Sequence, residues 1–236
     1  MLRAIGLSFA CAALIAATPL STMDPDNPTC PKSPNWGPSE KMTLTPAMRN
    51  GKKVLLAEGV IDPYLADRLR AAIDRDEMIE EVWLRSSGGD AEAGNEAGKV
   101  IRSFPGMLTR IPEGWTCFSA CNFVFMGGDR RVIEPGGVFM VHMFTFTGDR
   151  GMVDRSVKEG TSETVGLIGE IEQASALMAS QDNDFLIRMG VSRKLLTDVM
   201  YKQLATGGAK GQGERYCLTL EEAREYNVTP IERPAG

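Results

Sequence analysis

The sequence predicts a single α/β domain, built mainly from parallel strands with helices on the faces of the sheet. From residue 53 onward, short apolar runs alternate with stretches of helical periodicity, which is the pattern of successive β–α units. The 236 residues are 43% hydrophobic and 24% charged, enough for one substantial core and too apolar for a disordered chain. We therefore expect one domain over residues 53–230.

The first β–α units follow one another closely. Residues 54–61 are mostly apolar and predict a buried strand. Residues 64–74 have apolar side chains at helical spacing, with charged ones on the other face. Residues 79–85 predict a second short strand, which runs into a Gly-rich passage at residues 86–90 before a helix begins at Ala91.

The second half repeats this alternation, with a looser stretch after residue 142 and a long helix ended by Gly190. The expected elements are strands at residues 107–111, 131–133 and 138–142 and helices at residues 119–126, 162–189 and 192–204.

The N-terminal residues have a composition of their own. Arg3 gives a short positive region and residues 4–20 are uncharged, which is typical of a secretory signal peptide. We expect residues 1–23 to be that signal and the protein to be periplasmic, with an uncleaved membrane anchor as the alternative. Residues 24–52 are rich in proline and other breakers, and we expect a linker or surface arm there.

Charge and cysteine content narrow the partners and the compartment. The net charge of -5, without any run of basic residues, argues against nucleic acid. Four cysteines remain after the signal segment, and in an oxidising compartment an even number predicts disulfides. These cysteines, which allow three pairings, are Cys30, Cys117, Cys121 and Cys217.

Two side chains have the chemistry of a nucleophile site. Ser119 lies where a turn becomes an apolar helix, so its hydroxyl is exposed beside the positive helix end, although an ordinary N-cap serine is the alternative. His142 is the chain's single histidine and ends an apolar strand, where functional side chains of α/β sheets gather. A serine hydroxyl needs a base of this kind to accept its proton.

Five segments in this order resemble the Clp-type proteolytic subunits: residues 54–62, 82–89, 114–120, 139–142 and 218–226. The Cys-x-Ser-x-Cys surround of Ser119 and the signal segment are similar to those of exported Clp-protease-like proteins, members of the Clp/crotonase superfamily. The resemblance covers nearly all of residues 53–229 and implies a Clp/crotonase-like fold with repeated ββα units, a mainly parallel sheet and flanking helices.

The same resemblance implies the roles of the site residues. Ser119 matches the nucleophile and His142 the general base, while the backbone N–H groups of Gly89 and Ala120 match the oxyanion hole. The acid is less well matched, and Glu214 is the nearest carboxylate, with Asp198 as the alternative.

An extended peptide would lie in a substrate groove, held by main-chain hydrogen bonds. The groove residues implied are Gly88, Asp90, Met143 and Phe144. The resemblance thus implies a peptidase acting on peptides or unfolded chains as a homo-oligomer. Because export removes the ATP supply, no ATPase partner is expected.

The sequence also allows other functions. A catalytically inactive binding or assembly module would keep the fold without the chemistry, and a crotonase-like acyl-CoA enzyme fits export poorly. A Cys₃His zinc site would use Cys117, Cys121, His142 and one further cysteine, but the Cys-x-x-x-Cys spacing is uncommon for zinc and export favours disulfides. The Gly-rich passage lacks the spacing of nucleotide-binding motifs, so we expect no cofactor and no metal.

Overall fold

The computed structural model describes residues 23–25, 27–142, 150–205 and 215–230. The strands are β1 (Met23–Asp24), β2 (Asn27–Pro31), β3 (Thr43–Arg49), β4 (Lys52–Glu58), β5 (Ile79–Arg85), β6 (Leu108–Ile111), β7 (Thr116–Phe118), β8 (Arg130–Ile133), β9 (Val138–Val141) and β10 (Tyr216–Cys217). The helices are α1 (Leu65–Asp74), α2 (Ala91–Arg102), α3 (Cys121–Met126), α4 (Arg150–Glu159), α5 (Thr161–Met189), α6 (Lys194–Ala205) and α7 (Leu220–Glu225).

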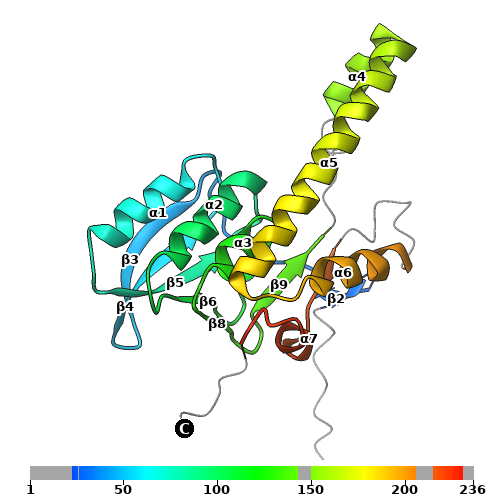
Figure 1. Cartoon of the computed structure of the whole chain (residues 1–236). Helices are drawn as coiled ribbons and strands as arrows, with labels where there is room; N and C mark the ends of the chain where they lie inside the picture. The colour runs from blue at the N-terminus through cyan, green and yellow to red at the C-terminus, as the bar shows by residue number, and fades with distance from the viewer. Residues whose placement is uncertain (1–22, 26, 143–149, 206–214, 231–236) are drawn as a thin grey trace, which may run out of the picture.

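The predicted α/β class, with a mainly parallel sheet and flanking helices, is confirmed. A five-stranded sheet has the order β3-β4-β5-β6-β8, in which β4, β5, β6 and β8 are parallel and only β3 is antiparallel to its neighbour. A three-stranded sheet has the order β10-β9-β7, with β7 and β9 parallel. Helices α1, α2 and α3 lie side by side over one face of the larger sheet (Figure 1).

The central strands β4 and β5 are apolar on both faces because both faces are covered. Leu55 and Leu84 belong to the main core beneath the helices, whereas Val54, Leu56 and Trp83 form a smaller cluster on the opposite face. A strand buried on both sides has a nearly continuous apolar sequence instead of an alternating one. These two strands were therefore predictable from composition alone.

The segment expected to be a linker or arm, residues 24–52, is instead part of the fold. All seven residues of β3 pair with β4, and Met42 just before β3 is fully buried. Cys30 in β2 is joined to Cys217 in β10 by a disulfide. Proline is compatible with this arrangement, since Pro46 lies in an edge strand that needs ladder partners on one side only.

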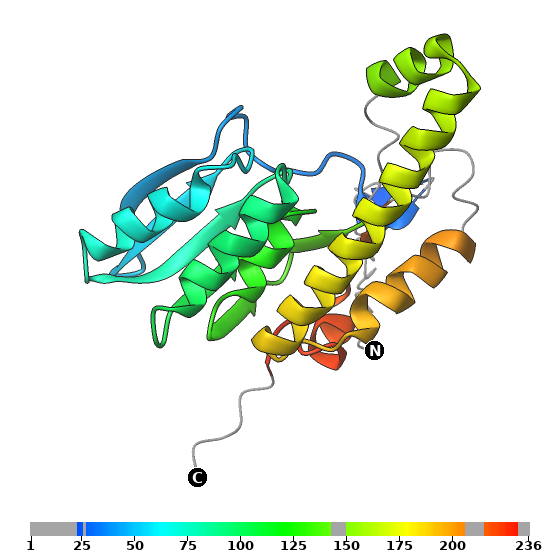
Figure 2. The ribbon, with the colours of Figure 1, turned by 45° about the horizontal axis from the view of Figure 1, so that its top comes forward.

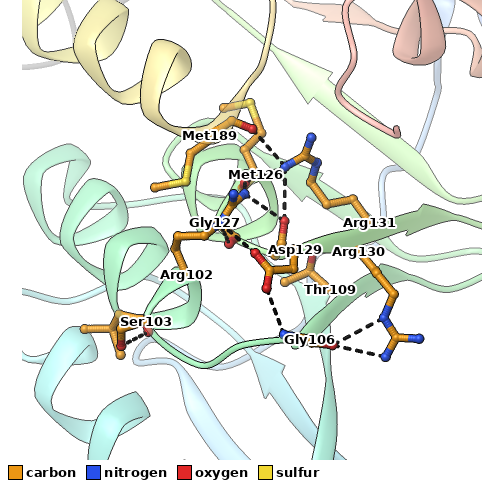
Figure 3. Close-up of polar contacts among 12 residues, drawn as sticks. Arg102, Ser103, Gly106, Thr109, Met126, Gly127, Asp129, Arg130, Arg131 and Met189 are labelled. Atoms are coloured by element: carbon orange, nitrogen blue, oxygen red, sulfur yellow. Dashed lines mark hydrogen bonds and ion pairs between the residues drawn. The ribbon is translucent and has the colours of Figure 1, made fainter. Parts of the chain in front are cut away.

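A buried arginine fixes the base of α5 to the rest of the domain (Figure 3). The Arg131 guanidinium donates to the carbonyls of Met126 at the end of α3, Met189 at the end of α5, and Val228 near the C-terminus. Burial lowers the pKa of Arg131 to about 10. Because its donors are satisfied by main-chain acceptors from several segments, Arg131 holds the end of α5 against α3, which follows the candidate site.

Helix α5 has two parts with different surroundings. Its C-terminal turns enter the core through Phe185, Leu186 and Met189. Its N-terminal turns extend away from the body and carry α4 at their far end, as both Figure 1 and Figure 2 show. Of the helices in the described ranges, none has the combination of length and apolarity that crossing a membrane requires.

Candidate active site

Ser119 occupies a sharp turn between β7 and α3. Its φ is +58°, in the left-handed region that residues other than glycine rarely adopt. The sequence predicted a helix starting near Ser119, but α3 begins two residues later, at Cys121. The left-handed backbone explains this shift, because such a residue cannot continue into a right-handed helix.

A disulfide spans the Ser119 turn. Cys117 in β7 and Cys121 at the start of α3 are bonded, with their Cα atoms 5.3 Å apart. Together with the bond from Cys30 to Cys217, it fixes one of the three pairings that the sequence left open. The sulfur atoms that the alternative zinc site would require are thus held in disulfides.

Strand pairing brings His142 to Ser119. β7 and β9 are parallel, with Phe118 opposite Met140, so the residues that follow the two strands meet at one edge of the sheet. His142 follows β9 directly, and its Nε2 lies 2.7 Å from the Ser119 Oγ. That distance lies within the range in which a base can accept a hydroxyl proton.

An aromatic side chain lies against the histidine. The Phe118 ring lies 4.8 Å from the His142 ring between centroids, and the Trp36 ring stacks on Phe118 with centroids 6.0 Å apart. Trp36 belongs to the segment that was expected to be a linker. The N-terminal segment therefore supports the site, and the sequence pattern had not indicated this role.

The loop after β5 passes directly beside Ser119 and requires glycine. Gly88 has φ +88°, and a Cβ there would lie 2.6 Å from the Ser119 Cβ. Gly89 has φ +141°, and a Cβ there would lie 2.2 Å from the Ile61 carbonyl oxygen. The Ile61 backbone holds the loop by accepting from Asp90 N at 3.0 Å and donating to Gly88 O at 2.8 Å.

The loop and the serine turn leave two backbone donors unused. In the part of the chain that the structure describes, the N–H groups of Gly89 and Ala120 donate to no protein acceptor. The Cβ position of Gly88 lies 3.1 Å from Ala120 N, so the loop and the turn are in close contact. These are the two groups that the resemblance implies for an oxyanion hole.

Of the other residues expected to line the substrate groove, the structure describes Asp90. The Asp90 side chain caps α2 by accepting from Ala93 N at 2.8 Å, so its carboxylate is already engaged in helix capping. Met143 and Phe144 lie outside the described residues.

The two expected acids also differ. Asp198 on α6 accepts a hydrogen bond from the Tyr226 hydroxyl at 3.1 Å and is absent from the lining of the Ser119 pocket. The described residues thus do not place Asp198 beside His142. Glu214 lies outside the described residues.

A pocket of about 70 Å³ opens beside Ser119 and His142 and contains a carboxylate that the sequence reading missed. Asp182 of α5 lines it, and burial raises the pKa of Asp182 to about 6. One signal was available in the sequence: Asp182 lies three, four and seven residues before the buried Phe185, Leu186 and Met189. It therefore lies on the inward face of the helix, where a charged residue is unusual.

The geometry defines an α/β protein with a serine–histidine pair at the carboxyl edge of two parallel strands. No protein-family model and no curated protein matches the chain. Among solved structures, a mutant of ClpP1 from Listeria monocytogenes is similar, with 16% identity, a TM-score of 0.46, and coverage of 74% of this chain and 86% of its own. A mutant of the 1510-N membrane-bound stomatin-specific protease has 15% identity, a TM-score of 0.42, and coverage of 73% and 74%.

Proposed function

We propose that this chain is an exported serine hydrolase that acts as a peptidase through Ser119 and His142. The observation that carries the proposal is the 2.7 Å contact between the Ser119 Oγ and the His142 Nε2. The position of Ser119 supports the proposal as well, because the serine lies in a left-handed turn that lines a pocket, beside a loop with an unused backbone donor.

The proposed chemistry is acyl transfer. As Ser119 Oγ bonds to the peptide carbonyl carbon, its proton passes to His142 Nε2, and the N–H groups of Gly89 and Ala120 stabilise the oxyanion. The C–N bond then breaks, and His142 returns the proton to the leaving amine. Water, deprotonated by His142, cleaves the acyl-enzyme and restores the serine.

Glu214 remains the proposed acid that orients His142. Tyr216 pairs with Val141 in the antiparallel ladder of β10 and β9. Val141 directly precedes His142 in the chain, and Tyr216 directly follows Arg215. Glu214 precedes Tyr216 by only two residues in the chain, and this closeness in the sequence supports the proposal. The alternative acid, Asp198, already accepts a hydrogen bond from Tyr226.

The proposal includes where the substrate binds and in which compartment the protein acts. We expect an extended peptide to lie between the loop at Gly88, Gly89 and Asp90 and the segment that contains Met143 and Phe144. The signal-like residues 1–23 and the two disulfides support export to an oxidising compartment. Substrates there are peptides or already unfolded chains, cleaved without an ATPase partner by a homo-oligomer.

A fluorophosphonate probe tests the chemistry directly. The mature protein is expected to be labelled between about pH 6 and 9, and Ser119→Ala is expected to abolish labelling. His142→Ala should slow it by about 10² to 10⁴-fold. Ser180→Ala, which changes an exposed serine of α5, is the matched control and should label normally. Absence of any Ser119-dependent labelling would refute the hydrolase proposal and favour an inactive binding module.

A further inference from the structure

The pocket beside Ser119 is lined by both apolar side chains and polar ones. Phe123 and Met126 of α3 line it together with Met178 of α5, and Asp182 lies one helical turn further along α5 than Met178. It adjoins the Ser119–His142 pair, so it is placed to receive the side chain next to a carbonyl that Ser119 attacks. A long aliphatic side chain with a polar end fits such a lining.

Asp182 has no counter-charge. In the described part of the chain its carboxylate makes neither a hydrogen bond nor an ion pair, and burial alone accounts for the rise of its pKa to about 6. An ionised carboxylate removed from water without a partner destabilises the folded protein. Perturbed carboxylates of this kind gather at functional sites, where a ligand supplies the missing partner.

A second unpaired acceptor lines the same pocket. Asn122 is 5% exposed, and its Nδ2 donates to the Met140 carbonyl at 2.7 Å. Its Oδ1 is buried and accepts no hydrogen bond from any residue that the structure describes. The pocket therefore contains two unpaired acceptors, the buried Oδ1 of Asn122 and the partly buried carboxylate of Asp182, and a ligand group that donates hydrogen bonds would satisfy both.

The charge around the pocket has the same sign beyond Asp182. An adjoining cavity of about 140 Å³ shares Asp182 and Met178 and is lined by Glu92, Glu96 and Lys99 of α2. Lys99 forms an ion pair with Glu96 at 2.6 Å, which leaves Glu92 and Asp182 as the uncompensated charges. The local field therefore favours a cation over an apolar or anionic group.

We propose that this pocket binds the lysine or arginine side chain of the residue whose carbonyl Ser119 attacks, with Asp182 holding the cationic end. The proposal rests on the proposed function, and it names the substrate class of that same site. The aliphatic stem of the substrate lies along Phe123, Met126 and Met178. Its cationic end pairs with the Asp182 carboxylate and donates to the Asn122 Oδ1.

Peptide diphenyl phosphonates with identical sequences test the selectivity. One carries lysine at the position next to the reactive group, and one carries norleucine, which has a similar stem without the charge. In the mature protein the lysine probe should react at least about tenfold faster with Ser119. Asp182→Asn should reduce the lysine-to-norleucine ratio to about one. Asp184→Asn, an exposed acid on the same helix, should leave the ratio unchanged.

Fluorophosphonate labelling, which requires no side-chain pocket, is measured on every variant as a control for folding. If Asp182→Asn reacts normally with it, a lost lysine preference reports on the pocket. An equal or faster reaction of the norleucine probe with the wild-type protein would overturn the proposal, as would an unchanged ratio in Asp182→Asn.

A different experiment applies if the proposed hydrolase function is wrong. If the fluorophosphonate does not label Ser119, the pocket is tested by titrating Ser119→Ala protein with the same peptides as amides. Tighter binding of the lysine amide, lost in Asp182→Asn, would retain the pocket and remove the chemistry. Equal binding of the two amides would refute both.

Discussion

Gly88 and Ser119 are in such close contact that either residue limits what the other can be. A Cβ at Gly88 would lie 2.6 Å from the Ser119 Cβ and 2.8 Å from the Phe118 carbonyl oxygen, and neither group is the end of a flexible side chain. Any added atom must therefore displace the loop or the nucleophile turn. A displacement of about 1 Å near the reacting groups is enough to cost about 10²-fold in rate.

Gly88→Ala is accordingly expected to slow fluorophosphonate labelling of Ser119 by about 10²-fold. Gly51→Ala is the matched control, because Gly51 has a similar φ of +76° but nothing within 4 Å of its Cβ position. In both variants alanine must adopt a positive φ, which costs about 1 kcal/mol in urea denaturation, and Gly88→Ala should lose more because its Cβ also meets the Ser119 turn. Equal labelling rates for the two would show that the contact with Ser119 does not matter.

Asp182 should lower the stability of the folded protein above about pH 6. Its pKa is raised by burial from 3.8 to about 6, so the folded chain retains a proton between these values that the unfolded chain releases. The stabilising effect of that retained proton is complete below about pH 4 and is lost as pH rises through about 6. The other titratable groups lining the two cavities are Glu92, Glu96, Lys99 and His142.

Asp182→Asn should therefore be more stable than the wild type by roughly 1 to 3 kcal/mol at pH 7. Near pH 3 the two proteins should have similar free energies of unfolding, because the carboxyl group is then protonated in both states. Urea denaturation at both pH values measures the difference. A variant that is less stable at pH 7 would indicate that the carboxylate has a stabilising partner.

The residue level also shows what a sequence reveals about a site. Ser119 and His142 could be singled out because each lies at the boundary of a recognisable element and has distinctive chemistry. Asp182 could not be recognised in the same way, since most of α5 is exposed and contains other acids. Its importance depends on which turn of α5 reaches the core, and that depends on tertiary packing around Phe185 and Met189.

The helices and strands that pack on the main core were the ones that could be predicted from the sequence. β4, β5, α1 and α2 have strong apolar patterns because each packs on the main core, and all were predicted within a few residues. β3 is an edge strand that contains a proline, and β7 has only three residues, so neither has a periodic pattern of its own. Both form because of pairing with another strand, β3 with β4 and β7 with β9, and not because of a local sequence preference.

The two disulfides should act on different properties. Cys117 and Cys121 are separated by 4 residues, so the chain-entropy model gives their bond a stabilising effect of only about 2 kcal/mol, but the bond spans the turn that contains Ser119. Cys30 and Cys217 are separated by 187 residues, and the chain-entropy model gives a bond of that kind a stabilising effect of about 5 kcal/mol.

Removing each bond by replacing both of its cysteines with alanine separates the two effects. The Cys117→Ala, Cys121→Ala variant should label at Ser119 about tenfold more slowly, because the turn is less restrained, and should lose at most about 2 kcal/mol in urea denaturation. The Cys30→Ala, Cys217→Ala variant should lose about 2 to 5 kcal/mol in urea denaturation. The expectation is contradicted if loss of the Cys117–Cys121 bond lowers stability more than loss of the Cys30–Cys217 bond does, or if it leaves the labelling rate unchanged.

At the scale of the whole molecule, the N-terminal part of α5 extends away from the body of the domain and leaves large apolar side chains exposed. It extends with α4 beyond the sheet and its covering helices (Figure 2). Both helices expose large apolar side chains, namely Val153, Val157, Val165, Ile168 and Leu177. An arm that exposes apolar side chains of this size is typical of an interaction surface, and the expected homo-oligomer supplies the partner as a second copy.

Sedimentation velocity of the mature protein at micromolar concentration tests this expectation. The wild type should sediment as an oligomer, and Val165→Glu with Ile168→Glu should shift it toward the monomer, because charges at a dry interface are left without partners. Met78→Glu is the control, since Met78 is 70% exposed and precedes β5 in the body of the domain, away from α5. A wild-type protein that sediments as a monomer, or an oligomer that the double variant leaves intact, would exclude this arm as the contact between copies.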